Sequence, residues 1–326
     1  MKFAVVGAGA IGGWLGARLA HAGLDVTLVA RGAHLDAMRT KGVTVLEPDG
    51  QELVARPDCT DDLGSISSAD AVFVTVKAHG LPRIAPELGS AVKADAMLVF
   101  AQNGIPWWYF LGLEEGRRLT SVDPGLAIAH NIAPRHVVGC VVYPATSVVA
   151  PGVIRHEEGN RLTLAEPDGS RSERLQALAR ELVRAGLKAP ISGRIREEIW
   201  LKLVGNATLN PLSALTRASL GGMLADPGMR ALTLALMQEV QAVAHSLGVR
   251  LPLDVEHRLQ GASELGDHRT SMLQDVEAGR PLEVEALVGS VVELAAQAEV
   301  PVPSLRTVYE LTRALDRALR EPREPR

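Results

Sequence analysis

A glycine-rich turn that directly follows a short β-rich run constrains this chain more than any other feature of its sequence. The β-rich run covers residues 2–6, the turn Gly7-Ala-Gly9-Ala-Ile-Gly12 follows at once, and a helical pattern continues to about His21. Strand, glycine-rich turn and helix in this order are what a dinucleotide-binding unit requires. A turn that is merely tight, with no ligand, is the alternative interpretation.

Each glycine of this turn has a separate expected role. Gly7 permits the tight turn, Gly9 lets the backbone approach a pyrophosphate, and Gly12 lets the helix pack close to the strand. The helix N-terminus would present free N–H groups and a partial positive charge to the phosphates. The predicted cofactor-binding residues of the turn are Gly7, Ala8, Gly9, Ala10, Ile11 and Gly12.

A cation follows each of the next two predicted strands. The β-rich run 25–30 ends on Arg31, and the run 71–76 ends on Lys77. In NAD-binding units the position of Arg31, at the end of the second strand, usually carries an acid that holds the ribose 2′-hydroxyl. An arginine there can instead bind a 2′-phosphate with two hydrogen bonds. Each cation alone could be a solvated surface charge. Together, at strand ends that line the ligand crevice, Arg31 and Lys77 favour NADP(H) as the cofactor.

Asn103 follows a further buried run, residues 96–101. It should lie at the edge of the sheet where the nicotinamide end of a dinucleotide is bound, and its amide could bridge cofactor and substrate there. Asn103-Gly104 is also a common turn pair, so an ordinary turn is the alternative. We include Asn103 among the predicted cofactor-binding residues.

The region from about residue 136 to 166 changes character. Alternating β-rich runs, punctuated by Gly and Pro, favour antiparallel strands that extend the sheet of the nucleotide domain. Residues 170–187 fit an amphipathic helix, and residues 189–192 fit a last short strand. The domain boundary is therefore expected near Gly193.

Every strong hydrophobic period after Arg194 is helical. The expected fold class is therefore α/β, with a Rossmann-like doubly wound sheet domain in residues 1–192 and an all-helical domain in residues 193–326. An active site in the cleft between the two domains is expected. The predicted helices cover residues 194–210, 228–247, 253–265, 271–278, 283–298 and 303–320.

The first of these helices carries a polar stripe on an otherwise apolar surface. Lys202, Asn206 and Asn210 are spaced four apart, which places them on one face of a helix. Pro211 should end or kink the helix at Asn210. Because a buried lysine is rare unless something pairs with it, the stripe indicates a site in an interior cleft. A lysine that reaches the surface beside two capping amides is the alternative.

A second segment, residues 269–283, carries two more candidate residues. Ser271 is placed to begin a helix, where its hydroxyl and the adjacent N–H groups could hold a carboxylate. Glu283 opens the next predicted helix, just after Pro281. Taken singly, an N-cap at Ser271 and a favourable first-turn acid at Glu283 are the simpler interpretations.

Composition excludes several classes of function. The net charge of −4 without a long basic run argues against binding to nucleic acid or to an anionic membrane. No apolar run reaches the length that crosses a bilayer, and the N-terminus enters a strand at once, unlike a signal peptide. Two cysteines are too few for a disulfide scaffold or a cysteine-based metal site. A cytoplasmic protein is expected, for which a homodimer and a monomer fit equally well.

Over essentially its whole length the chain resembles the ketopantoate reductase (2-dehydropantoate 2-reductase) family. The most specific part is Thr-Ser271-Met-Leu-Gln-Asp with an acid, Glu283, twelve residues after the serine. One residue departs from the pattern, because Leu220 stands where the best-known members carry an asparagine, which leaves the exact substrate open. The other residues that carry the resemblance are the glycines 7, 9 and 12, Arg31, Lys77, Gln102-Asn103-Gly104, Lys202, Asn206 and Asn210-Pro-Leu.

The resemblance implies NADPH-dependent reduction of a small-molecule 2-keto acid, giving D-pantoate for pantothenate and coenzyme A synthesis if the substrate is ketopantoate. Lys202 would be the general acid, because charge develops on the carbonyl oxygen during hydride transfer. Asn206 and Asn210 would orient the substrate, and Ser271 would hold its carboxylate or hydroxyl. Glu283 would bond a substrate hydroxyl and the Lys202 ammonium. A reductase of another keto acid and an NADP(H)-binding sensor without turnover are the alternatives.

Overall fold

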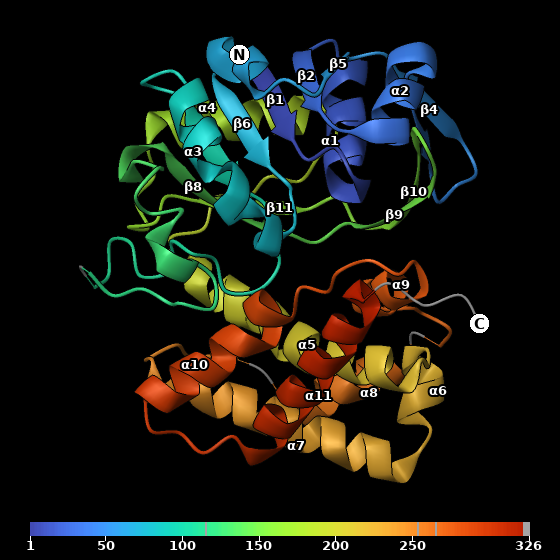
Figure 1. Ribbon diagram of the computed structural model, residues 1–326, viewed down its shortest axis with the longest axis vertical. Helices are drawn as coiled ribbons and strands as arrows, with labels where there is room; N and C mark the ends of the chain where they lie inside the picture. Colours follow the sequence, from blue (N-terminus) through green and yellow to red (C-terminus); the bar gives the residue numbers. More distant parts are fainter. Residues whose placement is uncertain (115, 253, 265, 322–326) are drawn as a thin grey trace. The chain divides into compact units, whose positions relative to one another are not determined.

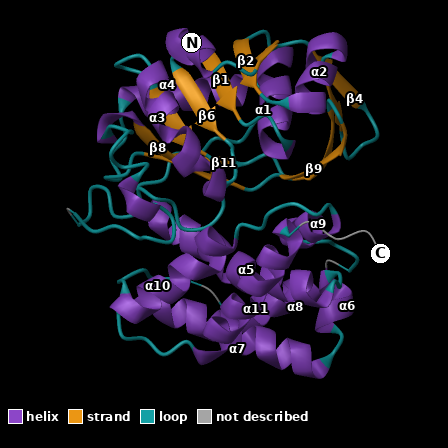
Figure 2. Ribbon diagram, in the orientation of Figure 1, coloured by secondary structure: helices purple, strands orange, loops and turns teal. Residues whose placement is uncertain are grey.

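The computed structural model describes residues 1–114, 116–252, 254–264 and 266–321. The chain divides into two compact units, one formed by Met1–Arg118 with Asp123–Ile195 and the other by Leu119–Val122 with Arg196–Arg326. Residues 322–326, which were predicted to belong to the helical domain, lie outside the described residues. Strands occur in the first unit and helices build the second, so the predicted α/β fold class is confirmed (Figures 1 and 2).

A seven-stranded sheet forms the centre of the first unit, in the order β11-β8-β7-β6-β1-β2-β5. Every neighbouring pair is parallel except β8 and β11. The strand order reverses at β1, so the ligand crevice of this sheet is expected beyond the carboxyl end of β1. The strands are β1 (Lys2–Val6), β2 (Asp25–Val29), β5 (Asp58–Thr60), β6 (Ala71–Val74), β7 (Met97–Phe100), β8 (Val137–Val142) and β11 (Leu162–Ala165).

The sequence explains why the central strands are covered on both faces. β6 and β7 are continuous apolar runs, Ala-Val-Phe-Val and Met-Leu-Val-Phe, and every residue in them is buried. Unbroken apolar runs of this kind are typical of parallel strands between two layers of helices. The helices of this unit are α1 (Ala10–His21), α2 (Gly32–Lys41), α3 (Leu81–Ala91) and α4 (Glu173–Arg184), with 3-10 turns at Leu63–Ser68, Ala78–Gly80, Pro124–Leu126 and Pro134–His136.

The region that was expected to extend the sheet with antiparallel strands does so only in part. β8 continues the sheet in parallel with β7, and β11 adds one antiparallel strand. The hairpin of β9 (Ala145–Ala150) and β10 (Val153–Glu158) instead joins β3 (Val43–Leu46) and β4 (Glu52–Ala55) in a separate sheet, ordered β4-β3-β10-β9. The prediction for this hairpin was therefore wrong, because β10 pairs with β3 rather than with the main sheet. The short strand expected at residues 189–192 is reduced to isolated bridges at Lys188 and Ile191.

Helix α1 lies between the two sheets and contacts strands of both. Two glycines make this close packing possible. A Cβ atom on Gly16 would come within 2.2 Å of the Leu28 side chain in β2, and one on Gly13 within 2.3 Å of Ile154 in β10. The side chain of Trp14 is completely buried beside them. The helix that follows the glycine-rich turn is thus fixed from two sides.

A partly buried charged cluster also holds α1 to the smaller sheet. The Arg18 guanidinium donates to both carboxylate oxygens of Glu47, each at 2.8 Å. The same carboxylate lies 2.7 Å from Nδ1 of His156 in β10, whose Nε2 is 2.5 Å from the Gly159 carbonyl. The Glu47 carboxylate therefore joins α1 to β10 through Arg18 and His156.

The second unit is organised around α7, which contacts α6, α8, α10 and α11. The Glu239 carboxylate on α7 accepts hydrogen bonds from the N–H groups of Ser304 and Leu305, and so caps the start of α11. Among the described residues, no helix combines the length and apolar character needed to cross a membrane. The helices are α5 (Ile195–Thr216), α6 (Leu220–Leu224), α7 (Pro227–Ser246), α8 (Val255–Glu264), α9 (Ser271–Glu277), a π-helix (Glu285–Gly289), α10 (Ser290–Gln297) and α11 (Pro303–Arg320).

Helix α5 differs from the prediction at its end. It was expected to end or kink at Asn210, but it runs past Pro211 to Thr216. A proline inside a helix removes one backbone hydrogen bond. The following turn buries Leu212, Ser213 and Ala214, and this burial compensates for the missing bond. The helix therefore continues, and the prediction that it ends there was wrong.

Candidate cofactor and substrate site

The glycine-rich turn is built as a cradle for an anion. The N–H groups of Gly7 and Ala8 both donate to the Val29 carbonyl, at 3.0 and 3.1 Å, which ties the turn to the end of β2. The first i→i−4 bond of α1 runs from the Gly13 N–H to the Gly9 carbonyl. The helix therefore makes no use of its first N–H groups, which are those of the predicted residues Ala10, Ile11 and Gly12. These donors lie at the positive end of the α1 dipole.

The three glycines of the turn differ in how much space a side chain would have at each position. Gly7 has a φ of +97°, and a Cβ there would lie 2.6 Å from the Val76 nitrogen. A Cβ on Gly12 would lie 2.4 Å from Thr75 Oγ1 and 2.5 Å from the Gly7 carbonyl. At Gly9 the nearest atom to such a Cβ is 3.9 Å away. Protein packing requires Gly7 and Gly12, whereas the space beside Gly9 is open for a ligand.

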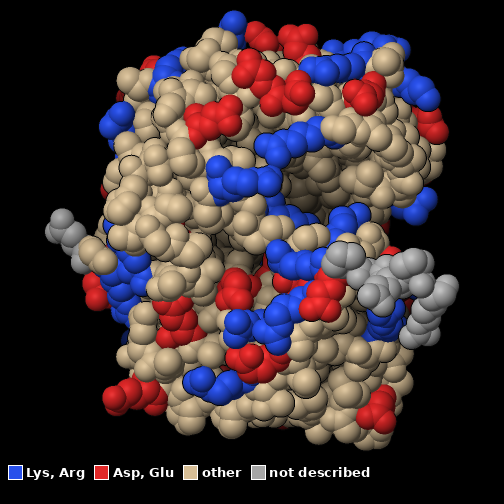
Figure 3. Space-filling model, in the orientation of Figure 1, with Lys and Arg blue, Asp and Glu red and all other residues tan. Residues whose placement is uncertain are grey.

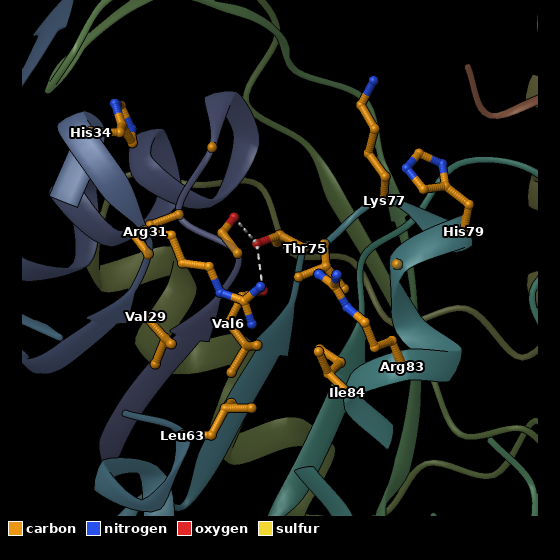
Figure 4. Close-up of a pocket in the computed structure, with 16 residues that line it drawn as sticks. Val6, Val29, Arg31, His34, Leu63, Thr75, Lys77, His79, Arg83 and Ile84 are labelled. Carbon is orange, nitrogen blue, oxygen red and sulfur yellow. Dashed lines mark hydrogen bonds between the residues drawn. The ribbon is translucent and has the colours of Figure 1, made fainter. Parts of the chain in front are cut away.

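Thr75, just beyond β6, supports the turn and was not predicted from the sequence. Its hydroxyl lies 2.8 Å from the Gly7 carbonyl and 3.2 Å from the Val6 carbonyl (Figure 4). The amide of Gln102 donates to the Val76 carbonyl at 2.8 Å and so links the ends of β6 and β7. A hydroxyl one strand away from a glycine fingerprint is a signal that could have identified Thr75.

A cavity of about 420 Å³ opens beside this turn. Its walls combine the turn with the ends of β2 and β6, as expected at the point where the strand order reverses. No Asp or Glu is among its lining residues, while five of them are Arg, Lys or His. The lining residues are Val6, Gly7, Ala8, Gly9, Val29, Ala30, Arg31, His34, Leu63, Thr75, Val76, Lys77, His79, Gly80, Arg83 and Ile84.

The charge of this cavity comes from its arginines and its lysine rather than from His34. Nδ1 of His34 accepts a hydrogen bond of 2.9 Å from the Gly152 N–H, which requires that nitrogen to be unprotonated. Burial lowers the pKa of His34, opposed in part by its interaction with the Ala8 backbone. His34 is therefore neutral near pH 7. On the face drawn in Figure 3, Lys and Arg side chains gather around a hollow in the upper part of the view.

The structure brings the predicted residues Gly7, Ala8, Gly9, Arg31 and Lys77 together around this cavity. Asn103 lies in the loop after β7, half-buried and directly before Gly104, which has a φ of +89°. It does not line the cavity. The role predicted for Asn103 at the nicotinamide end stays a prediction.

In the helical unit, α5 carries the polar stripe as expected from its spacing. Asn210 is 6% exposed, while Lys202 and Asn206 are half-buried. The side chain of Trp200 beside them is completely buried. A half-buried lysine packs part of its apolar stem against the protein. The role of Lys202 as a proton donor stays a prediction.

Ser271 lies beside the stripe. The Asn210 amide lies 3.5 Å from the Ser271 hydroxyl, so α5 and the start of α9 present two candidate substrate-binding groups together. The N-cap of α9 is Thr270, whose hydroxyl accepts from the Leu273 N–H at 3.2 Å. Ser271 is the first residue of the helix and is exposed, so its hydroxyl is not the cap that the simpler interpretation assumed.

Glu283 follows a loop whose residues Arg280 and Leu282 are each held by an aspartate. The Leu282 N–H donates to the Asp316 carboxylate at 2.8 Å, and Arg280 pairs with Asp275 of α9 at 2.9 Å. Glu283 is half-buried, and its carbonyl accepts from the Leu287 N–H as the helical segment begins. The π-helix at Glu285–Gly289 follows directly, and single π turns are frequent near functional sites.

Leu220, the departure from the family pattern, has a structural role. It begins α6, is 3% exposed, and its N–H donates to the His268 carbonyl at 3.0 Å. The next residue, Gly221, donates to Gly266 at 2.7 Å. Leu220 therefore packs in the core and pins the loop that leads to Ser271, and it offers no polar group to a substrate.

A doubly wound sheet with a glycine-rich cradle and an acid-free cationic cavity, together with a helical second unit, is typical of dinucleotide-dependent oxidoreductases. Two family models match this chain: "Ketopantoate reductase PanE/ApbA" over residues 3–169 and "Ketopantoate reductase PanE/ApbA C terminal" over residues 194–316. The chain belongs to the ketopantoate reductase family. The resemblance found in the sequence is thereby confirmed.

Individual proteins agree with the family models. The 2-dehydropantoate 2-reductase of Mesorhizobium japonicum is 48% identical over 319 residues, which cover 97% of this chain and 98% of that protein. A structure from Ralstonia solanacearum MolK2, solved as a candidate ketopantoate reductase, has a TM-score of 0.91 and 42% identity and covers 98% of both chains. A D-mandelate dehydrogenase in a ternary structure with NADH shares the fold, with a TM-score of 0.83 at 21% identity over 98% of this chain and 99% of that one. The fold alone therefore fixes neither the substrate nor the dinucleotide.

Proposed function

We propose that this protein reduces 2-dehydropantoate (ketopantoate) to D-pantoate with NADPH, in the synthesis of pantothenate and coenzyme A. The observation that carries the proposal is the membership of the whole chain in the ketopantoate reductase family, with 48% identity to a curated 2-dehydropantoate 2-reductase. The fold would serve other 2-keto acids equally well, so the substrate is proposed from this close relative and not from the fold.

The first unit fits a bound dinucleotide. The open space at Gly9 and the unused N–H groups of α1 suit a pyrophosphate, and the acid-free cavity suits a further phosphate. An acid at the end of β2 would favour NAD by binding the ribose 2′-hydroxyl, and Arg31 stands there instead. We therefore assign NADP(H) to this family member. When bound, the dinucleotide supplies the hydride.

The helical unit supplies the groups that act on the substrate. As hydride reaches the ketone carbon, negative charge builds on the carbonyl oxygen, and Lys202 donates a proton to that oxygen from its ammonium group. Asn206 and Asn210 orient the substrate by hydrogen bonds, and Ser271 binds its carboxylate or hydroxyl. Glu283 accepts a hydrogen bond from a substrate hydroxyl and holds the Lys202 ammonium. The expected site between the domains stays a prediction.

Product analysis tests this proposal. The protein is incubated with ketopantoate and NADPH, and the product is separated by chiral chromatography. We expect D-pantoate in an amount equal to the NADPH consumed. The sensor alternative predicts that NADPH binds without being oxidised by ketopantoate or by any other 2-keto acid, and the L-enantiomer would contradict the substrate orientation proposed here.

Glu283 gives a separate prediction about substrate choice. Glu283→Ala should lower kcat/KM for a hydroxylated 2-keto acid by about tenfold more than for the same keto acid without the hydroxyl. A hydrogen bond to a charged group contributes about 1.5–3 kcal/mol, and only the hydroxylated substrate can lose it. Steady-state kinetics with the matched pair measures the difference, and equal losses for both substrates would remove the proposed hydroxyl contact.

The location and assembly of the protein belong to the same proposal. Neither Cys59 nor Cys140 forms a disulfide. Burial raises the pKa of Cys59 to about 11, so it is an unreactive thiol. We place the protein in the cytoplasm, as a small-molecule enzyme that binds neither nucleic acid nor membrane. A homodimer is compatible with the apolar helices of the second unit.

A further inference from the structure

Two guanidinium groups enter the cofactor cavity from different elements, and only Arg31 was predicted from the sequence. Arg31 follows β2 and precedes α2, while Arg83 lies in the first turn of α3. Both line the same cavity. Figure 4 shows the two side chains pointing toward each other across it, with Val6, Leu63 and Ile84 below them and the Lys77 side chain extending away.

Among the residues that the structure describes, no acidic side chain pairs with either arginine. Within the described part of the chain, neither Arg31 nor Arg83 forms a hydrogen bond or an ion pair through its side chain. The cavity lining contains no carboxylate. α2 and α3 begin beside it with no side-chain cap and no acid in the first turn, so the positive ends of two helix dipoles add to the field. Two like charges that converge without a counter-ion indicate an anionic ligand group.

We propose that Arg83 and Arg31 together hold the 2′-phosphate of the adenosine ribose, and that Arg83 is a determinant of the preference for NADPH over NADH. A phosphate monoester carries a charge of about −1.5 to −2 near neutral pH, which two guanidinium groups balance. Each planar guanidinium donates two parallel hydrogen bonds to phosphate oxygens. The inference rests on the proposed function, because it requires the cavity to hold a dinucleotide.

A different role for Arg83 makes a different prediction. A guanidinium that stacked on the adenine ring would contribute equally to binding of both dinucleotides, because NADH and NADPH share that ring. A guanidinium on the 2′-phosphate contributes to NADPH alone. The ratio of the two dissociation constants therefore separates the roles.

The test uses isothermal titration calorimetry to compare the Kd values of wild type and Arg83→Gln. The four ligands are NADPH, NADH, adenosine 2′,5′-bisphosphate and 5′-AMP. We expect the Kd of NADPH and of the bisphosphate to rise by about tenfold or more, as for loss of charge-assisted hydrogen bonds, with the Kd of NADH and 5′-AMP unchanged. Arg180→Gln, which removes an exposed arginine of α4 outside the cavity, is the matched control and should leave all four unchanged.

Equal losses for NADPH and NADH in Arg83→Gln, or no loss for either, would overturn the role of Arg83 while leaving the reductase proposal intact. Equal affinity of the wild-type protein for NADPH and NADH would instead refute the NADP assignment itself. The two failures are read from different samples and cannot be confused.

Discussion

Lys202→Ala is expected to lower kcat for ketopantoate reduction by about two orders of magnitude or more, the usual effect of removing a general acid. Lys202 lies on α5, half-buried, one helical turn from Asn206 and two from Asn210. Without its ammonium group, the charge that develops on the carbonyl oxygen has neither a cation nor a proton donor. The measurement is steady-state NADPH oxidation at saturating ketopantoate, at several pH values.

Two further variants separate proton donation from other effects. Lys202→Arg keeps the positive charge, but arginine does not release a proton near neutral pH, so turnover should remain low. Lys188→Ala removes an exposed lysine of the first unit and should retain wild-type kcat. The Kd of NADPH should be the same in all three variants. Wild-type turnover in Lys202→Ala would remove Lys202 from the mechanism.

Gly9→Ala should weaken cofactor binding and leave the stability of the fold nearly unchanged, whereas Gly12→Ala should lower the stability of the fold. A methyl group on Gly9 meets no protein atom closer than 3.9 Å, so the free energy of unfolding should be nearly unchanged. The same methyl group occupies the space where the pyrophosphate approaches the backbone, so NADPH affinity should fall by about two orders of magnitude, as for loss of two charge-assisted hydrogen bonds.

Gly12→Ala places its methyl group 2.5 Å from the Gly7 carbonyl, which is backbone and cannot move away cheaply. The free energy of unfolding should therefore fall by about 1–3 kcal/mol, as for overpacking elsewhere. Urea denaturation without cofactor, together with NADPH titration, measures both effects. If Gly9→Ala is as unstable as Gly12→Ala, the open space at Gly9 is not kept for a ligand.

Much of the nucleotide-binding unit could be predicted because its signals are local in the sequence. The turn from Gly7 to Gly12 lies between a strand and a helix that follow one another directly, so its geometry depends on few distant residues. The stripe of Lys202, Asn206 and Asn210 is equally local, since helical spacing alone places the three on one face. For the same reason the helices after α6 were predicted within a few residues of their bounds, with the predicted helix 283–298 formed by the π-helix and α10 together.

Features that depend on distant partners were not predicted. The β9–β10 hairpin has an alternating pattern that fits either sheet, and only its pairing with β3, far away in the sequence, decides between them. α6 has five residues and two glycines, too short for a periodic signal. Pro211 normally ends a helix, and tertiary burial of the next turn overrode that preference.

The cofactor site shows the same limit. Arg31 was identified because it follows a strand directly, where the dinucleotide fingerprint assigns a position to it. Arg83 lies farther from its strand, in the first turn of α3, and the sequence does not show which face of that helix the cavity uses. A basic residue in the first turn of the helix that follows a strand can nevertheless indicate a phosphate site when the chain also carries a dinucleotide fingerprint.

This protein belongs to the ketopantoate reductase family, and we propose that it uses NADPH rather than NADH. The most direct test is kcat/KM of the wild-type protein for ketopantoate and for a panel of 2-keto acids that lack its hydroxyl or differ in branching, each with NADPH and with NADH. We expect the highest kcat/KM for ketopantoate with NADPH. A higher value for another keto acid, or equal values with both dinucleotides, would contradict it.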